Sequence, residues 1–179
     1  GLLPVKINTV VKKGVNEHTL VALADYCREN QYIPRFIEYM DVGTLNGWRK
    51  DDVVSANEIV EMIDAVFPLQ PIEPSYKGEV ATRFRYVDGQ GEIGVISSVT
   101  QPFCGDCTRL RLSPEGQLVT CLFAEKGTDL RSPMREGASD NDLRRIMEKT
   151  WTLRDDRYSE ERAQSTKART KVEMYHIGG

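Results

Sequence analysis

The 179-residue chain lacks the features that mark a membrane, secreted or nucleic-acid-binding protein. No apolar run approaches the ~20 residues that a membrane-spanning helix requires, so we expect no membrane partner. The first residues lack a basic segment and a cleavage site, which argues against a signal peptide. The net charge is only −3, with acidic and basic residues interspersed. We therefore expect no nucleic-acid partner, and any affinity for anions must be local.

Cysteine is scarce, and its few positions are uneven. Cys104, Cys107 and Cys121 follow a C-x2-C-x13-C pattern, whereas Cys27 stands alone. Such bunching favours a metal site in a reducing, cytoplasmic environment over disulfides. Three thiols without a fourth protein ligand fit an iron–sulfur cluster with one open iron better than structural zinc, which takes four ligands. Cys27 follows a helical spacing with Leu20 and is predicted to be a core residue.

Two other interpretations of the three thiols stay open. A zinc site would need a fourth ligand, and the candidates are His176, far along the chain, and Cys27. A disulfide with one spare thiol is the second alternative.

An Arg-x-Arg sequence, Arg109-Leu110-Arg111, follows closely on Cys107. On a strand the two arginines would point to the same face, because side chains alternate. A guanidinium stays charged and can bind phosphate with two parallel hydrogen bonds. An open iron beside two guanidiniums predicts a site for an anionic substrate. The alternative is two surface arginines on an edge strand.

The first third of the chain predicts alternating strands and helices. Residues 5–11 and 33–40 are expected to be strands, and residues 16–29 and 55–66 helices, the first capped by Asn16 and the second opened by a capping box. This alternation predicts parallel strands in an α/β layout. Two parallel strands alone do not make a stable sheet buried on both faces. We therefore expect further strands upstream, in a longer protein.

The middle of the chain predicts two antiparallel hairpins, over residues 79–97 and 108–122. The second hairpin would carry Cys121 on its return strand and bring it beside Cys104 and Cys107, because paired strands lie ~5 Å apart.

The last third is expected to be helical from Ser139 onward. Within it, the charged stretch 155–162 is either a solvated connection or a structured ion-pair cluster.

Polar side chains inside the predicted strands raise a second question. Lys6 in the first strand, and Arg35 and Glu38 in the second, need a partner or a ligand if these strands are buried. Lys6 would face the interior if the first strand lines a barrel, although a solvent-facing lysine is the simpler interpretation. Met40 ends the second strand, at the mouth where barrel sites lie, unless it only fills the core.

Together these stretches resemble the C-terminal part of the GTP 3′,8-cyclase family, the radical S-adenosyl-L-methionine (SAM) enzymes of molybdenum cofactor biosynthesis. The matching segments span essentially the whole chain and are Val5–Asn8, Lys13–Asn16, Arg35–Gly43, Phe103–Arg111, Cys121–Phe123, Asp155–Ser159 and Gly178-Gly179. The resemblance implies an α/β fold. Residues 1–70 would be the last βα units of an incomplete TIM-like (radical SAM) barrel. Residues 71–179 would be a C-terminal α+β domain that binds a cluster and GTP.

The resemblance also implies a role for each candidate residue. The residues implied to bind a [4Fe-4S] cluster, whose open iron holds guanine, are Cys104, Cys107 and Cys121. Those implied to bind GTP are Lys6, Arg109, Leu110 and Arg111. Met40 is implied to line the SAM site. Those implied to take part in catalysis are Arg109, Arg111, Gly178 and Gly179.

The chain has no C-x3-C-x2-C motif, on which the family builds the other [4Fe-4S] cluster, the one that cleaves SAM. We expect the whole protein to convert GTP to (8S)-3′,8-cyclo-7,8-dihydroguanosine 5′-triphosphate and this part alone to be inactive. An open sheet edge could also support a homodimer. The alternatives are a non-catalytic Fe–S or zinc-binding module, and an auxiliary-cluster relative that acts on a peptide.

Overall fold

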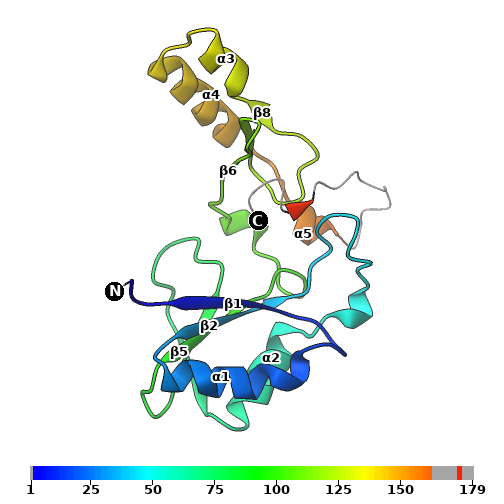
Figure 1. Ribbon diagram of the computed structural model, residues 1–179, viewed down its shortest axis with the longest axis vertical. Helices are drawn as coiled ribbons and strands as arrows, with labels where there is room; N and C mark the ends of the chain where they lie inside the picture. Colours follow the sequence, from blue (N-terminus) through cyan, green and yellow to red (C-terminus); the bar gives the residue numbers. More distant parts are fainter. Residues whose placement is uncertain (1, 163–172, 175–179) are drawn as a thin grey trace. The chain divides into compact units, whose positions relative to one another are not determined.

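The computed structural model describes residues 2–162 and 173–174, which fall into two compact units (Figure 1). The first unit comprises Gly1–Met40 and Trp48–Cys107, and the second comprises Asp41–Gly47 and Thr108–Gly179. The predicted catalytic glycines, Gly178 and Gly179, lie outside the described residues, as does His176. Each unit is described by itself below.

The first unit is built on a five-stranded sheet with the strand order β1-β2-β5-β4-β3. Its strands are β1 (Lys6–Val11), β2 (Ile33–Glu38), β3 (Leu69–Ile72), β4 (Thr82–Tyr86) and β5 (Glu92–Ile96). β1, β2 and β5 are parallel, whereas β4 and β3 continue the sheet antiparallel. The predicted parallel pairing is confirmed, and so is the α/β class at the level of a mixed sheet with helices. The barrel stays a prediction.

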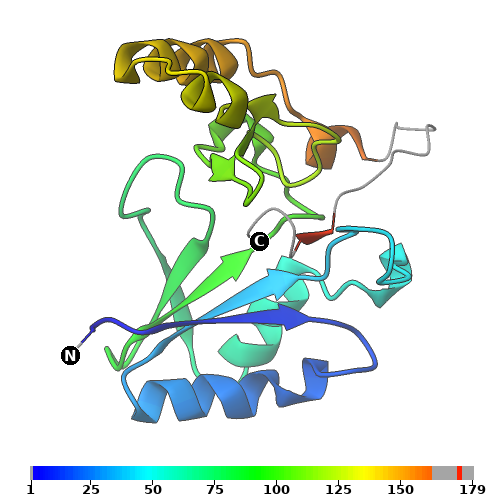
Figure 2. The same ribbon diagram turned by 45° about the horizontal axis from the view of Figure 1, so that its top comes forward.

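Two helices cover one face of this sheet (Figure 2). They are α1 (Leu20–Glu29), preceded by the 3-10 turn η1 (Glu17–Thr19), and α2 (Ala56–Asp64). α2 begins in the predicted capping box, since Ser55 and Glu58 each accept a hydrogen bond from the other's backbone N–H, at 3.2 and 2.8 Å. The apolar side chains between helices and sheet form the core: Val11, Leu20, Phe36, Ile59, Ile63, Ile93 and Val95.

Asn16 does not cap the first helix as predicted, and η1 has no side-chain cap. Its Oδ1 accepts a hydrogen bond from the N–H of Lys12 at 2.8 Å, and its Nδ2 donates to the carbonyl of Val10 at 2.9 Å. The amide therefore satisfies backbone groups where β1 ends, a role that competes with capping for asparagine side chains.

The first predicted hairpin is confirmed in β4 and β5, which pair antiparallel. It belongs to the first unit, because β5 also pairs with β2, with Val95 opposite Phe36. The compact units consequently divide after Cys107 and not at residue 70. The assignment of 1–70 and 71–179 to two family domains stays a prediction.

The described part of the second unit contains a small antiparallel sheet and three helices. Its strands, in the order β6-β7-β8, are β6 (Arg111–Leu112), β7 (Gln117–Val119) and β8 (Thr128–Asp129). Its helices are α3 (Arg131–Arg135), α4 (Asp140–Thr152) and α5 (Tyr158–Glu161). The second hairpin and the helix start at Ser139 are confirmed. Cys121, predicted on the return strand, instead follows β7 by two residues.

None of the helices within residues 2–162 and 173–174 is long and apolar enough to cross a membrane.

Candidate functional site

The sheet face opposite the helices carries basic side chains from β1 and β2. The parallel register sets Asn8 beside Arg35, and Lys6 lies on the same face two residues earlier. Arg35 Nε donates a hydrogen bond to Asn8 Oδ1 at 2.8 Å. No described carboxylate forms an ion pair with Lys6 or Arg35. This face therefore offers positive charge to an anion.

Gly94, which the sequence reasoning missed, makes room for Arg35. The two residues are neighbours in the β2–β5 register. A Cβ at Gly94 would lie 3.3 Å from Cγ of Arg35 and 3.1 Å from Cβ of Ala81, so a larger residue would push Arg35 aside. A glycine within a strand often marks such a close approach, which was the available signal.

Glu38, the buried carboxylate that the sequence singled out, is fully satisfied by protein groups. It is 0% exposed. Its oxygens accept hydrogen bonds of 2.5 to 2.8 Å from the backbone N–H groups of Ala56, Val99 and Thr100 and from the Thr100 hydroxyl. Glu38 therefore joins the end of β2 to the start of α2 and to the turn after β5. Its role is structural.

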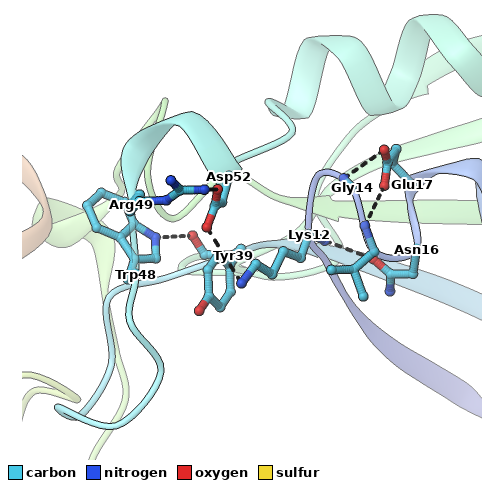
Figure 3. Close-up of polar contacts among 9 residues, drawn as sticks. Lys12, Gly14, Asn16, Glu17, Tyr39, Trp48, Arg49 and Asp52 are labelled. Carbon is cyan, nitrogen blue, oxygen red and sulfur yellow. Dashed lines mark hydrogen bonds and ion pairs between the residues drawn. The ribbon is translucent and has the colours of Figure 1, made fainter.

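A polar network fixes the loops at the carboxyl ends of β1 and β2 (Figure 3). Lys12 Nζ lies 3.5 Å from Asp52 Oδ2 and 4.7 Å from the centre of the Tyr39 ring. Arg49 Nη2 lies 2.7 Å from Asp52 Oδ1. The hydrogen bond from Arg49, aided by the charges of Arg49 and Lys12, holds the pKa of Asp52 below its usual value. The positive charge of Lys12 is thus balanced within the protein by Asp52.

Met40 follows the carboxyl end of β2 and is half-buried. Next to it, Trp48 Nε1 donates a hydrogen bond to the carbonyl of Tyr39 at 2.7 Å and so draws together the two ends of the segment Asp41–Gly47 (Figure 3). We call this segment the β2 loop. Sites in barrel enzymes lie at the carboxyl ends of the parallel strands, where Met40 lies. The contact of Met40 with SAM stays a prediction.

Cys104 and Cys107 share one 3-10 turn, η3 (Cys104–Asp106), which the N–H of Cys107 closes by donating to the carbonyl of Cys104 at 3.3 Å. Both are half-buried and belong to the first unit. Cys121 is half-buried in the second unit, where its Sγ accepts a hydrogen bond from the N–H of Phe123 at 3.4 Å. Within either unit alone, the described His, Cys, Asp and Glu residues include no group of three that could hold a metal. The meeting of the three thiols stays a prediction.

The donor set fits a [4Fe-4S] cluster better than zinc. None of the four cysteines, all of which the structure describes, forms a disulfide. Cys27 is confirmed as a core residue, 0% exposed, and burial raises the pKa of its thiol. It is therefore unsuited to serve as the fourth ligand that structural zinc needs. Cys104, Cys107 and Cys121 remain as the candidate ligands, and three thiolates would leave one iron of a four-iron cluster open.

Arg109 and Arg111 lead into β6 in the second unit. Both are partly buried, while Leu110 and Leu112 between and after them are 41% and 61% exposed. This alternation agrees with the prediction that the two guanidiniums share one side of the chain. The strand itself is shorter than predicted and begins only at Arg111.

A cleft of about 370 Å³ lies beside Cys121 in the second unit. The residues that line it come from the segment after β7 and from the start of α5: Cys121, Phe123, Ala124, Glu125, Lys126, Asp155, Asp156, Arg157, Tyr158 and Glu161. The charged stretch left open at 155–162 therefore contributes a structured wall and is not merely solvated.

Asp41, which the sequence reasoning missed, organises this wall. Asp41 is 5% exposed, and its carboxylate accepts hydrogen bonds from the Tyr158 hydroxyl at 2.5 Å and from Arg162 Nε at 2.9 Å. The Tyr158 ring stacks on Phe123 with ring centres 4.2 Å apart. Phe123 is two residues from Cys121, so the same cluster that holds Asp41 also fixes the backbone at Cys121.

Comparisons with known proteins show which family this chain belongs to. The family model described as Molybdenum Cofactor Synthesis C matches residues 33–160. A GTP 3′,8-cyclase of Acidothermus cellulolyticus is 54% identical over 167 residues, which covers 91% of this chain and 46% of the relative. One from Xanthomonas campestris pv. campestris (strain 8004) is 46% identical over 179 residues, covering 100% of this chain and 52% of the relative. One from Synechococcus sp. (strain WH7803) is 47% identical over 174 residues, 97% and 49% respectively.

By its fold the chain is a mixed α/β protein, and its sequence carries a cysteine motif with an Arg-x-Arg stretch. The chain belongs to the Molybdenum Cofactor Synthesis C family, and the predicted resemblance to GTP 3′,8-cyclases is confirmed along its whole length. It spans about half the length of the curated relatives that it matches.

Proposed function

We propose that this chain is the part of a GTP 3′,8-cyclase that binds the second [4Fe-4S] cluster and GTP. The observation that carries the proposal is the match to proteins of that name along the whole chain, at 45% identity or more. Cys104, Cys107 and Cys121, none of which forms a disulfide, and the Arg109–Arg111 stretch support it, because they are the groups that such a site requires.

Cys104, Cys107 and Cys121 hold the cluster as thiolates. When bound, the cluster supplies an open iron as a ligand site for the guanine base. Arg109 and Arg111, two and four residues after Cys107 in the sequence, would supply two fixed positive charges, which would favour the triphosphate and also the thiolate form of the ligands.

Lys6 and Arg35 add positive charge on the sheet face, where no described carboxylate neutralises them. In the proposal Lys6 contacts GTP, and Leu110 contributes backbone groups and an apolar surface to the nucleotide site. Met40 lines the SAM site, and Gly178 and Gly179 take part in the rearrangement of GTP.

The whole protein, in this proposal, converts GTP to (8S)-3′,8-cyclo-7,8-dihydroguanosine 5′-triphosphate for molybdenum cofactor biosynthesis. The radical that starts the reaction depends on a C-x3-C-x2-C motif that this chain lacks. The chain alone therefore binds the cluster and GTP but does not convert GTP to product.

A zinc-binding module is the second candidate. The core position of Cys27 weighs against it, because it removes the fourth cysteine of the sequence from the set of possible fourth ligands.

Anaerobic reconstitution of the purified chain with iron and sulfide tests the cluster. We expect about four irons and four sulfides per chain and a broad absorption in the violet. Cys104→Ala should abolish this loading, whereas Cys27→Ala, the matched control, should retain it. One zinc per chain without iron, or full iron loading of the Cys104→Ala variant, would contradict the proposal.

A further inference from the structure

The carboxylate of Glu173 is held by the backbone of the β2 loop (Asp41–Gly47). The N–H and the hydroxyl of Thr44 donate to Glu173 Oε1 at 2.7 and 2.9 Å. These bonds, together with one from the N–H of Leu45, hold the pKa of Glu173 below its usual value. The loop therefore receives Glu173 as an anion.

Gly43 shapes this receptor in two ways. Its φ of +65° is a left-handed conformation that side chains other than glycine rarely adopt. A Cβ at this position would also overlap the Glu173 carboxylate. The positive φ and the missing side chain of Gly43 thus leave space for one carboxylate. The loop forms a backbone concavity of the kind that binds anions.

A second contact attaches the same loop to the C-terminal part of the chain. Arg162 Nε donates to the carboxylate of Asp41 at 2.9 Å, and the Tyr158 hydroxyl donates to it at 2.5 Å. Arg162 and Glu173 lie on either side of residues 163–172 in the sequence. The side chains of both nevertheless bind the same seven-residue β2 loop. Two contacts separated by ten residues of sequence argue against a chance contact between the β2 loop and this part of the chain.

We propose that Glu173 is a positioning residue that docks the C-terminal end of the chain on the β2 loop, next to Met40. This inference rests on the proposed function insofar as it gives Gly178 and Gly179 a catalytic role. The docking itself is independent of that role.

Chain length shows what the Glu173 contact contributes. Gly178 is five residues from Glu173 but sixteen from Arg162, the previous described attachment. An extended chain spans at most ~3.6 Å per residue, so Gly178 can reach ~18 Å from Glu173 and ~58 Å from Arg162. The local concentration of a tethered group falls with about the −3/2 power of tether length. Loss of Glu173 would lengthen the tether of Gly178 from five to sixteen residues and so lower its local concentration about sixfold.

Amide hydrogen exchange on the 179-residue chain tests the docking. We expect Glu173→Ala to speed exchange at Thr44 and Leu45 about tenfold or more, and Glu173→Gln, which keeps an acceptor, to restore part of the protection. Gly14 and Val15 are an internal control, because Glu17 holds their N–H groups in a similar way at 2.8 and 3.1 Å (Figure 3). Exchange at Gly14 and Val15 should not change. Equal protection of Thr44 in wild type and Glu173→Ala overturns the proposal.

Activity of the full-length protein tests the positioning role. Glu173→Ala should lower the turnover of GTP about sixfold, while iron content and GTP affinity stay at wild-type values. Faster exchange at Thr44 with unchanged turnover overturns the positioning role. A wild-type protein that binds cluster and GTP but forms no cyclised product contradicts the proposed function instead, and the exchange result then decides the docking by itself.

Discussion

The hydroxyl of Tyr158 donates a hydrogen bond of 2.5 Å to the carboxylate of Asp41, 117 positions earlier in the chain. The carboxylate is 5% exposed, so it depends on protein donors in place of water. This bond attaches the β2 loop to α5, and the stack of Tyr158 on Phe123 extends the attachment toward Cys121. The hydrogen bond between Tyr158 and Asp41 thus stabilises both the β2 loop, which follows Met40, and the backbone near Cys121.

Tyr158→Phe should lower the free energy of unfolding by about 1–3 kcal/mol, because it removes one donor from a buried carboxylate and keeps the ring stack. Denaturant titration measures the change. Tyr76→Phe is the control, since Tyr76 is 57% exposed, and it should change stability by less than about 0.5 kcal/mol. A Tyr158→Phe variant as stable as the control would show that the bond to Asp41 contributes little.

Glu38→Gln should destabilise the chain by about 2–4 kcal/mol. The amide group of glutamine is a donor, and it would face two of the donors that now meet a carboxylate oxygen. Thermal or denaturant unfolding checks the loss. Glu61→Gln, at an exposed position of α2, is the matched control and should be nearly neutral. Equal stability of both variants would contradict the structural role of Glu38.

Tyr86 gives a pH-dependent prediction. Burial raises its pKa to about 12 from an ordinary value of 10, and its hydroxyl has no hydrogen-bond partner among the described residues. Folding therefore favours the neutral phenol. The stability that this contributes is complete below about pH 10 and falls as the pH rises toward 12.

Tyr86→Phe should remove this alkaline loss and change stability at pH 7 by less than about 1 kcal/mol, because no hydrogen bond is broken. Urea midpoints at pH 7 and pH 11 measure both effects. Tyr26→Phe, at a position 53% exposed, should leave the alkaline loss as in wild type. A Tyr86→Phe variant that loses stability between pH 7 and 11 as steeply as wild type would contradict the assignment.

Arg109→Ala and Arg111→Ala should each weaken GTP binding to the reconstituted chain about 10- to 100-fold, the range for loss of a charged hydrogen bond. Calorimetric titration gives the affinities. Arg135→Ala, at an exposed position of α3, should leave the affinity unchanged. Unaltered affinity in both Arg109→Ala and Arg111→Ala would favour a relative that acts on a peptide.

The sequence predicted those features that neighbouring residues determine. The capping box at Ser55, the helix start at Ser139 and the parallel pairing of β1 with β2 follow from local patterns, and the structure has them. It did not predict that β5 would lie beside β2, because strand order depends on contacts far apart in the chain. The predicted cap at Asn16 failed because its amide had a competing partner at the end of β1.

The candidate site divides in the same way. The thiols and the Arg-x-Arg stretch were visible as a motif, and they lie within the residues that the family model matches. Asp41 and Glu173 were not visible, because what distinguishes them is a partner 117 or 129 positions away. An aspartate or glutamate near the surface carries no mark of such a partner in a single sequence.

The central claim is that three thiols hold a cluster whose open iron receives GTP. Electron paramagnetic resonance of the reconstituted, reduced chain, recorded with and without GTP, tests it most directly. We predict a [4Fe-4S] signal that changes shape when GTP is added, does not change with ATP, and is lost in Cys121→Ala. A cluster signal that GTP leaves unaltered, or one that persists in Cys121→Ala, would contradict the account.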